Sequence, residues 1–430
     1  MVNSPHAERD RDAPPRRRRR TAYNFFVAGV PAVNAGVVIG HLAGAPGDPL
    51  EAGVPAHVAL RLVLLNLLIA ILLRTGPVTD GAYRAVVALG RGKSPVVRRI
   101  AGWAEGYGGL HAGFALSATL WFLVMNHSML WSDLYPPTCV AVNGFLVVAL
   151  AGVQVSAVGP ARRRAPGLFR VLHRTGTWLV IGLLWLQMDF VLARRHRGTP
   201  WTEAVLPAPE FWLLVAITAL VVLPWLLLRR VPVEVVRVSG EVVEFRLVLR
   251  RPRPGALVVV SRTPLGTCHR FTLVVEPGRA GATLVASRRL DWVSDLVDFP
   301  QSHLWVHAAP SSSGSYLGHL HPSAIFIVTG TAITEGLARL ARNGNRTELV
   351  WVVRGPVRAY GMDFVDRVEA LAPDLVIVDT SVQSDVDLLE MARELHAGAG
   401  ADAVGVAGGR EAVRRVRDGL AHDGVPTFGG

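Results

Sequence analysis

Six long apolar runs in the first half of this 430-residue chain constrain its fold more than any other feature. Each run is close to the roughly 17–25 residues that a helix needs to cross about 30 Å of hydrocarbon. Half of the residues are hydrophobic and the mean hydropathy is +0.34, values that soluble proteins rarely reach. The sequence therefore predicts a membrane-embedded, all-α bundle of six helices. The predicted spans are residues 22–43, 57–73, 107–125, 138–158, 168–193 and 211–228.

The net charge of +12 comes largely from short basic blocks beside these runs. Basic loops stay on the cytoplasmic side of a membrane, so the blocks indicate topology rather than nucleic-acid binding. We therefore expect a multi-pass protein of the inner (plasma) membrane with both termini in the cytosol, the lipid bilayer as its partner and no nucleic-acid partner. Residues 1–20 lack an apolar stretch and are predicted to be a cytosolic tail. One loop disagrees, because Arg194, Arg195 and Arg197 fall on the predicted outer side.

The second half of the chain has two successive patterns. Short Val-rich runs separated by Gly and Pro predict an antiparallel barrel or sandwich of about six strands, at 233–238, 241–249, 256–261, 271–276, 282–287 and 303–308. After residue 322, strands alternate with helices, which predicts a parallel, doubly wound sheet. Its strands are expected at 324–329, 347–354, 375–379 and 403–407, and its helices at 334–343, 363–370, 385–397 and 410–420.

Two histidines fall inside the predicted bundle at one depth. His111 and His173 lie near the starts of the third and fifth spans, which run in the same direction. Two opposed imidazoles at one depth in a bundle can ligate a haem iron from both sides. The alternative is that each ring forms a hydrogen bond with a neighbouring helix. The sequence offers no clean second pair for an outer haem, and the only cysteines, Cys139 and Cys268, exclude a disulfide framework, an iron–sulfur cluster and a zinc site.

Three segments of the second half are candidates for cofactor binding. His269, Arg270, Phe271 and Thr272 place a cation, an aromatic ring and a hydroxyl on one strand, which suits a flavin but also an ordinary barrel strand. The segment 310–316, with Ser313 and Gly314, is either a phosphate loop or a linker. Gly330 and Thr331 follow a strand and precede a helix, where a dinucleotide pyrophosphate would lie. Gly408 follows a later strand and belongs to the same carboxyl edge.

These features occur in an order that resembles the ferric reductase and NADPH oxidase superfamily, and most closely the TmpA-type integral membrane proteins, which also occur fused behind adenylate-forming reductases. The resemblance covers nearly the whole chain after residue 20 and depends on the order and spacing of its short motifs. The shared stretches are 172–178 (LHRTGTW), 268–272 (CHRFT), 287–288, 291–292, 304–306 (LWV), 328–333 (VTGTAI), 348–351 (ELVW), 360–361 and 424–429 (GVPTFG).

The resemblance implies four parts: a tail (1–20), the six-span bundle (21–230), an FAD-binding β-barrel (231–320) and an NAD(P)-binding α/β domain (321–430). The last two would form a cytosolic ferredoxin-reductase-like module. It further implies that His269, Phe271 and Thr272 contact FAD, that Gly330 and Thr331 contact NAD(P)H, and that His111 and His173 hold a b-type haem. The expected function is a membrane oxidoreductase that passes electrons from NAD(P)H via FAD to the haem or to a membrane-side acceptor.

The chain departs from the superfamily at several points: the outer haem pair is incomplete, and residues 311–316 replace the usual glycine–aromatic phosphate motif. The nucleotide loop lacks a second glycine and a proline, because Ala332 and Glu335 stand there. Ala407 replaces the cysteine that precedes Gly408 in the superfamily. These departures leave an alternative open: a catalytically reduced relative that serves as a membrane sensor, transporter or scaffold for a partner enzyme.

Overall fold

The computed structural model describes residues 17–43, 54–130, 135–252, 256–276, 280–307, 318–341 and 346–429. The chain divides into two compact units. The first consists of residues 21–75 and 106–223, and the second of residues 1–20, 76–105 and 224–430. The cytosolic loop that the sequence predicted between the second and third spans therefore belongs to the same unit as the barrel and the sheet.

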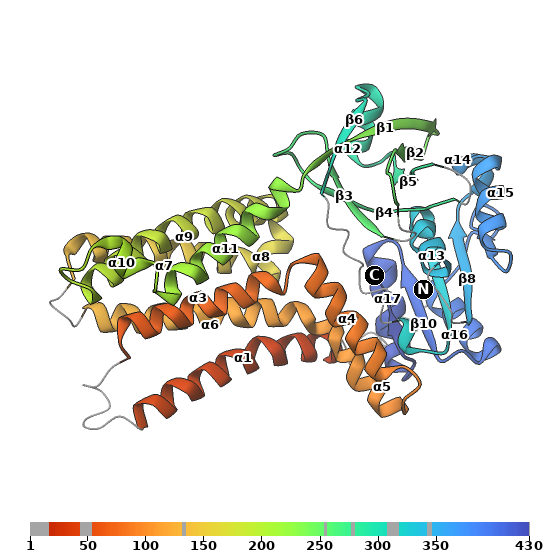
Figure 1. The fold of residues 1–430 in the computed structure, drawn as a ribbon. Coiled ribbons are helices and arrows are strands. Elements are labelled where there is room, and N and C mark those ends of the chain that lie inside the picture. The colour runs from red at the N-terminus through yellow and green to blue at the C-terminus, as the bar shows by residue number, and fades with distance from the viewer. Residues whose placement is uncertain are drawn as a thin grey trace, which may run out of the picture. The chain divides into compact units, whose positions relative to one another are not determined.

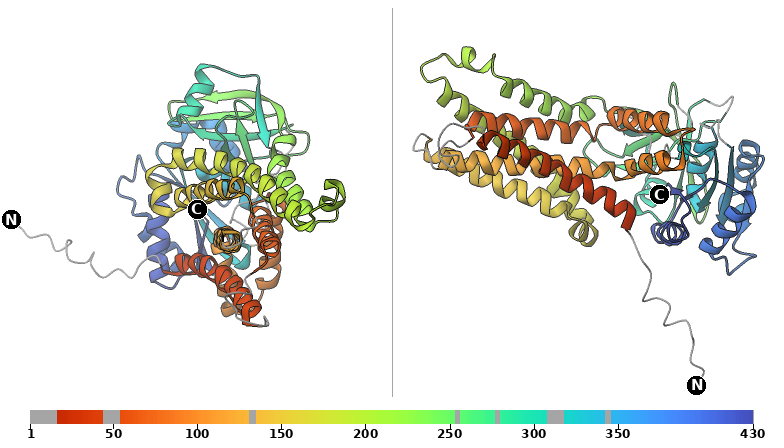
Figure 2. Two further views of the ribbon diagram at one scale, coloured as in Figure 1. Left: turned by 90° about the vertical axis from the view of Figure 1, so that its left-hand side faces the viewer. Right: turned by 90° about the horizontal axis from the view of Figure 1, so that it is seen from below.

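The first unit is entirely helical (Figure 1). Helix α3 runs along α6 and α7 runs along α9, as the two further views also show (Figure 2). Their apolar residues form one core that includes Leu60, Leu64, Phe122, Met125 and Leu184. The helices are α1 (Arg17–Ala43), α3 (Ala56–Leu72), α6 (Gly108–Leu130), α7 (Pro137–Ala157), α8 (Gly159–Arg164), α9 (Pro166–Arg195), α10 (Trp201–Val205) and α11 (Pro209–Leu226).

Four of the described helices are long and apolar enough to cross a membrane: α6, α7, α9 and α11. A fifth candidate arises if α3 and the following α4 (Gly76–Gly90) count as one broken span. The first predicted span, residues 22–43, is helical in α1. The secondary structure of the predicted spans is thus as expected, and a six-span membrane bundle stays a prediction.

Small residues on α6 allow α1 to approach it closely. A Cβ atom at Gly109 would lie 2.4 Å from the carbonyl oxygen of Tyr23, and one at Gly113 would lie 2.7 Å from that of Phe26. Glycines four residues apart share one face of a helix and are common at close helix crossings in membranes. Any side chain at these two positions would push α1 away from α6.

The second unit contains a six-stranded antiparallel barrel. Its strands are β1 (Arg229–Val238), β2 (Val242–Leu247), β3 (Leu257–Ser261), β4 (His269–Thr272), β5 (Ala282–Ser287) and β6 (His303–His307), in the order β4-β3-β6-β1-β2-β5. An antiparallel bridge between Val274 and Thr283 joins the two edges. Helix α12 (Asp291–Asp298), which the sequence did not predict, places the fully buried Val293 and Leu296 in the barrel core.

The α/β domain has a five-stranded parallel sheet in the order β11-β10-β7-β8-β9. Helices α13 and α15 pack on one face, and α16 and α17 on the other, so the sheet is doubly wound as predicted. Its elements are β7 (Ser323–Thr329), η3 (Gly330–Ala332), α13 (Ile333–Leu340), β8 (Arg346–Val353), α14 (Pro356–Tyr360), α15 (Met362–Leu371), β9 (Val376–Asp379), α16 (Leu388–Ala399), β10 (Ala403–Ala407), α17 (Arg410–His422) and β11 (Thr427–Phe428).

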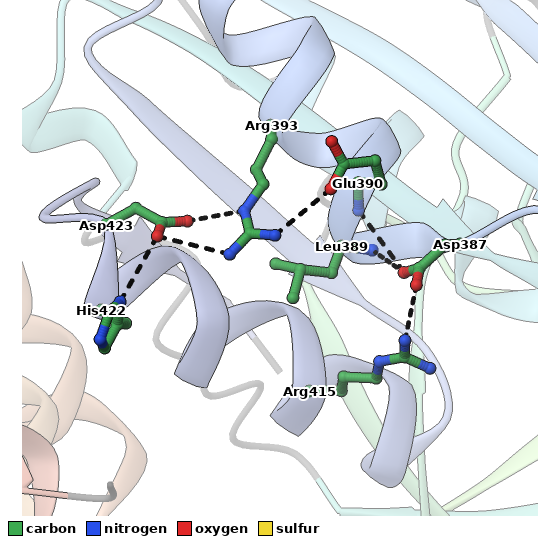
Figure 3. A network of polar contacts seen from close by, with 7 residues as sticks. All are labelled: Asp387, Leu389, Glu390, Arg393, Arg415, His422 and Asp423. Atoms are coloured by element: carbon green, nitrogen blue, oxygen red, sulfur yellow. Dashed lines mark hydrogen bonds and ion pairs between the residues drawn. The ribbon is translucent and has the colours of Figure 1, made fainter. Parts of the chain in front are cut away.

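Polar contacts join the parts of this unit. Arg367 of α15 donates hydrogen bonds of 2.8 Å to both carboxylate oxygens of the buried Glu244 on β2, which joins the sheet domain to the barrel. On the far face, Asp387 accepts hydrogen bonds from the first N–H groups of α16 and pairs with Arg415 of α17 (Figure 3). Arg393 of α16 pairs with Asp423 after α17 (Figure 3).

Residues 76–105 form the remaining helices of the second unit, α4, α5 (Pro95–Ala101) and η1 (Gly102–Tyr107). Arg98 of α5 lies 3.7 Å from Asp402 of the α/β domain, which itself accepts hydrogen bonds from the N–H and hydroxyl of Ser323. Gly90 lies against Leu320, because a Cβ atom there would be 2.7 Å from the Leu320 side chain. The segment is therefore packed against the start of β7.

Candidate functional site

The carboxyl edge of the parallel sheet brings three of the predicted residues together. In the order β11-β10-β7-β8-β9, successive strands are added on one side of β7 (β8, β9) and then on the other (β10, β11), and ligands of open α/β sheets bind at such a switch point. Gly330 and Thr331 directly follow β7, and Gly408 directly follows β10. Gly330 has a φ of 55° and Gly408 a φ of 146°, a region in which side chains are strained.

Gly408 has no room for a side chain. A Cβ atom there would lie 1.8 Å from the Thr329 hydroxyl oxygen and 3.0 Å from the Thr329 Cβ. At the ends of β7 and β10, the backbone of Gly408 therefore packs directly against the side chain of Thr329. A phosphate that reached this edge would meet exposed main chain rather than side chains, which is the role glycines have in dinucleotide sites.

Aromatic side chains pack beside Gly330 at this edge of the sheet. The indole N–H of the fully buried Trp351 donates a hydrogen bond of 3.0 Å to the Gly330 carbonyl oxygen. Tyr360 packs edge-on against Trp351, and its hydroxyl lies near Gly330. Burial raises the pKa of the Tyr360 hydroxyl, so this group stays neutral and can donate a hydrogen bond. None of these contacts was visible in the sequence, because each joins residues far apart in the chain.

The end of β9 carries a carboxylate held by donors. Asp379 accepts hydrogen bonds from the Ser381 hydroxyl, the Ser381 N–H and the Gly355 N–H. These donors, the Ser381 hydroxyl foremost, lower the pKa of Asp379, and Arg358 contributes to the shift. The loops after β8 and β9 are thereby joined. The sequence predicted that this strand ends at residue 379, but it did not show which donors the Asp379 carboxylate would bind.

The first turn of α13 holds an acidic side chain that would oppose a phosphate. Burial raises the pKa of Glu335, which favours its neutral form. A neutral carboxylic acid at a helix N-terminus repels an anion less than a carboxylate does. The residues at this edge therefore fit a nucleotide whose phosphates approach Gly330, Thr331 and Gly408.

The four predicted flavin contacts on β4 do not form one surface. His269 pairs with Val260 and Phe271 with Val258, and both valines face the barrel core. Directly opposed residues of an antiparallel pair share a face, so His269 and Phe271 lie on the core side. Arg270 and the buried Thr272 lie on the other side of the strand.

Trp292 of α12 covers the two rings on the core side. Its indole stacks on His269 with ring centroids 4.5 Å apart and lies 5.8 Å from the Phe271 ring. A flavin ring that stacked on Phe271 at this position would compete with Trp292. Contact between the β4 residues and FAD therefore stays a prediction, and it would require the Trp292 indole to move away from the Phe271 ring. Ser313 and Gly314, the candidates for a phosphate loop, lie outside the described residues.

His111 and His173 come together in the helical unit. Their ring centroids are 6.4 Å apart and their planes are inclined by 66°. The Nδ1 atom of His111 lies 2.8 Å from the Ala70 carbonyl oxygen. Because a carbonyl oxygen only accepts, this nitrogen carries the proton and Nε2 keeps its lone pair. The Phe169 ring packs 5.1 Å from His173.

The spacing of the two rings fits an iron between them. Metal–imidazole nitrogen bonds are about 2.0 Å long and the nitrogen lies about 1.2 Å from the ring centre, so an ion midway gives centroids roughly 6.4 Å apart. The described residues contain no cluster of three or more His, Cys, Asp or Glu side chains suited to a metal ion. The centroid distance does not establish that the imidazole nitrogens face each other, so a metal between the two rings stays a prediction.

A family model described as "Adenylate-forming reductase 03009, C-terminal domain" matches residues 315–430. Adenylate-forming reductase 03009 of Coprinopsis cinerea is 26% identical over 373 residues, covering 86% of this chain and 36% of the relative. Adenylate-forming reductase 06235 of the same organism is 24% identical over 380 residues, covering 87% and 37%. The chain thus spans little more than a third of the length of these relatives.

Solved structures similar to the chain include a ferredoxin NADP+ reductase from Neisseria gonorrhoeae with bound FAD and NADP, at 13% identity and a TM-score of 0.40. It is covered over 98% of its length by 47% of this chain. A cytochrome P450 reductase from Amycolatopsis is similar over 45% of this chain and 66% of its own, at 14% identity and a TM-score of 0.33.

Proposed function

We propose that this protein is a membrane electron-transfer protein in which His111 and His173 hold a b-type haem and the crevice at Gly330 and Gly408 receives NAD(P)H. The observation that carries the proposal is the 6.4 Å separation of the two imidazoles inside a helical bundle. Ionisable residues inside a membrane are uncommon and usually functional. When bound, a haem supplies a one-electron carrier inside the bundle.

The protein's own residues would prepare this site in two ways. The hydrogen bond from His111 to the Ala70 carbonyl fixes the ring tautomer and orientation, as carbonyl partners do for metal-ligating histidines. The Phe169 ring beside His173 restricts the rotation of that imidazole and keeps water away. Two rings held in this way lose little conformational freedom when they bind a metal.

The nucleotide crevice would act through backbone and aromatic groups. The glycine main chain at the switch point lets phosphates approach closely, and the Tyr360 hydroxyl and the Trp351 ring shape the adjacent floor. Because NAD(P)H gives up two electrons as a hydride and a haem accepts one at a time, a flavin would have to stand between them; His269, Phe271 and Thr272 of β4 would hold it once the Trp292 indole had moved aside. The physiological electron acceptor would be a small molecule or a partner enzyme on the membrane side.

The test is an absorbance spectrum of the purified full chain in detergent, oxidised and dithionite-reduced, with flavin extraction from the same sample. We expect sharp reduced bands of a low-spin haem, which His111→Ala and His173→Ala abolish while the protein stays in the membrane. His127→Ala, in the same helix as His111, is the matched control and should keep the bands. A well-folded wild-type protein without haem absorbance would refute the proposal.

A second candidate is a catalytically reduced module that serves a partner enzyme. Two observations favour it: Trp292 covers the predicted flavin strand, and the relatives, named adenylate-forming reductases, carry the matching segment within a much longer protein. On this hypothesis the chain would act as a membrane sensor, transporter or scaffold for an adenylate-forming enzyme. NAD(P)H-dependent reduction of an artificial acceptor by the purified protein would count decisively against it.

A further inference from the structure

The segment of α4 and α5 exposes an unusual set of apolar side chains. Leu89 is 73% exposed, Val96 64% and Ile100 65%, and Val97 and Trp103 are exposed as well. Val96, Val97 and Ile100 lie on one side of α5, because Ile100 is four residues after Val96 and three after Val97, and residues at these spacings are neighbours on a helix. We call these five residues the apolar face. Soluble proteins rarely leave such a set in contact with water.

The rest of the segment is already occupied by its own unit. Arg98 of α5 pairs with Asp402, and Gly90 at the end of α4 packs against Leu320. The polar side of the segment is thus used to hold the α/β domain. The apolar face is what remains exposed, so a partner of the segment would meet it there.

The charge around the apolar face selects an anionic partner. Residues 74–105 contain six basic and two acidic side chains. Arg91 and Lys93 lie exposed in the turn between α4 and α5, beside the apolar face. An apolar stripe with a tryptophan and a basic rim is the composition of helices that lie in the interface of an anionic membrane.

The chain itself keeps the segment close to a bilayer. Trp103 is five residues before Gly108, where α6, a candidate span, begins. Five residues reach at most about 18 Å, so a membrane that contains α6 is always within range of the apolar face. Such tethering gives the bilayer surface a high effective concentration that a soluble partner would lack.

We propose that the apolar face of α4 and α5 inserts into the headgroup region of the cytosolic leaflet, with Arg91 and Lys93 on anionic lipid phosphates. This inference rests on the membrane part of the proposed function, and not on its haem or nucleotide sites. Through Arg98 and Asp402 the same segment holds the start of β7, so the anchored face fixes the α/β domain to the membrane surface.

The test uses the full chain in lipid nanodiscs with an environment-sensitive fluorophore at one cysteine. Cys268→Ser removes the exposed native thiol, and the other native cysteine, Cys139, is fully buried. Val96→Cys and Ile100→Cys place the label on the apolar face. Val382→Cys, at a valine that is 82% exposed on the α/β domain, is the matched control.

We expect lipids that carry a quencher in their headgroup or upper acyl region to remove about half of the fluorescence at positions 96 and 100, and almost none at position 382. Replacing anionic by zwitterionic lipid, or combining Arg91→Glu with Lys93→Glu, should weaken this quenching. Quenching of positions 96 and 100 by aqueous iodide alone would refute the proposal. Protection from both quenchers would also refute it, because another protein surface would then cover the face. Failure of the chain to enter nanodiscs at all would instead contradict the proposed membrane function.

Discussion

Replacement of Gly408 by alanine should destabilise the second unit through a contact that the structure defines closely. The new Cβ would lie 1.8 Å from the Thr329 hydroxyl oxygen, 3.0 Å from its Cβ and 3.4 Å from its main-chain nitrogen. Rotation of Thr329 can move the hydroxyl but not the Cβ, so the backbone must shift. The φ of 146° adds strain that glycine does not feel.

These two effects together cost about 2–6 kcal/mol, taking roughly 1–3 kcal/mol for the backbone conformation and a similar amount for overpacking. For a unit of about 200 residues each kcal/mol lowers the melting temperature by roughly 2–4 °C, so we expect a fall on the order of 10 °C. Thermal unfolding of the purified full chain, followed by circular dichroism, measures it.

The neighbouring glycine provides the control. Gly409 has an ordinary φ of −58°, and a Cβ atom added there would meet no heavy atom within 4 Å, so Gly409→Ala should change the melting temperature little. Adding Thr329→Gly to Gly408→Ala should recover part of the loss, since it removes both side-chain contacts. If Gly408→Ala were no more destabilising than Gly409→Ala, the proposed close approach of the two loops would be refuted.

Three further changes test the second unit. Burial lowers the pKa of His321 from 6.5 to about 4; Arg98 and Arg339 contribute to this shift, and Asp402 opposes it. Between pH 6.5 and 4 the unfolded chain therefore binds a proton more readily than the folded chain, so the free energy of unfolding should fall by about 3 kcal/mol across that interval. His321→Gln should flatten this slope in acid unfolding curves. Arg367→Met leaves the buried Glu244 without its cation and should cost roughly 3 kcal/mol in urea unfolding, much of it recovered by adding Glu244→Gln. Asp387→Asn keeps the helix cap but removes the exposed ion pair with Arg415, so its cost should be below about 1 kcal/mol, whereas Asp387→Ala should cost about 1 kcal/mol more.

Three outcomes would contradict these expectations. An unchanged acid slope in His321→Gln would show that another group controls it. A mild Arg367→Met effect would mean that Glu244 is reached by water, despite its 3% exposure. Equal losses in Asp387→Asn and Asp387→Ala would assign the effect to the ion pair rather than to the cap.

The sheet domain could be predicted from the sequence because its strands are short, Val-rich and separated by amphipathic helices. The β10 strand was expected at 403–407 and lies at Ala403–Ala407. Helix α12 was missed because it has only eight residues, a window too short for its four apolar side chains to establish a helical period. Residues 76–105 lie between the second and third predicted spans, and their basic residues were used only as a topology signal; their packing against Leu320 and Asp402 joins residues far apart in the chain.

The candidate sites differ in how much of their geometry could be predicted from the sequence. Gly330 and Gly408 could be placed at one edge because parallel strands end at the same side of a sheet. The faces of β4 could not be assigned, because they depend on the register between Phe271 and Val258, a contact set by the barrel as a whole. Trp292 was therefore invisible as a neighbour of His269, although both lay in stretches that carried the resemblance.

One of the three arginines that disagreed with the predicted topology, Arg195, has a structural explanation: it lies close to a buried carboxylate. The carboxylate of Glu210, at the start of α11, is fully buried, and its Oε1 atom accepts a hydrogen bond of 2.6 Å from Arg61 and lies 4.0 Å from Arg195. Arg195 thus compensates a buried charge within the helical unit, and a compensated charge is a weaker topology signal than a solvated one. Arg61→Met should therefore cost about 3–5 kcal/mol by leaving Glu210 with only the distant Arg195, while the double change with Glu210→Gln should cost less. If the single and double variants unfolded alike in detergent titrations, Arg61 would not be acting through Glu210; the compensation of Arg195 by the same carboxylate would then lose its support, and Arg195 would again count against the six-span topology.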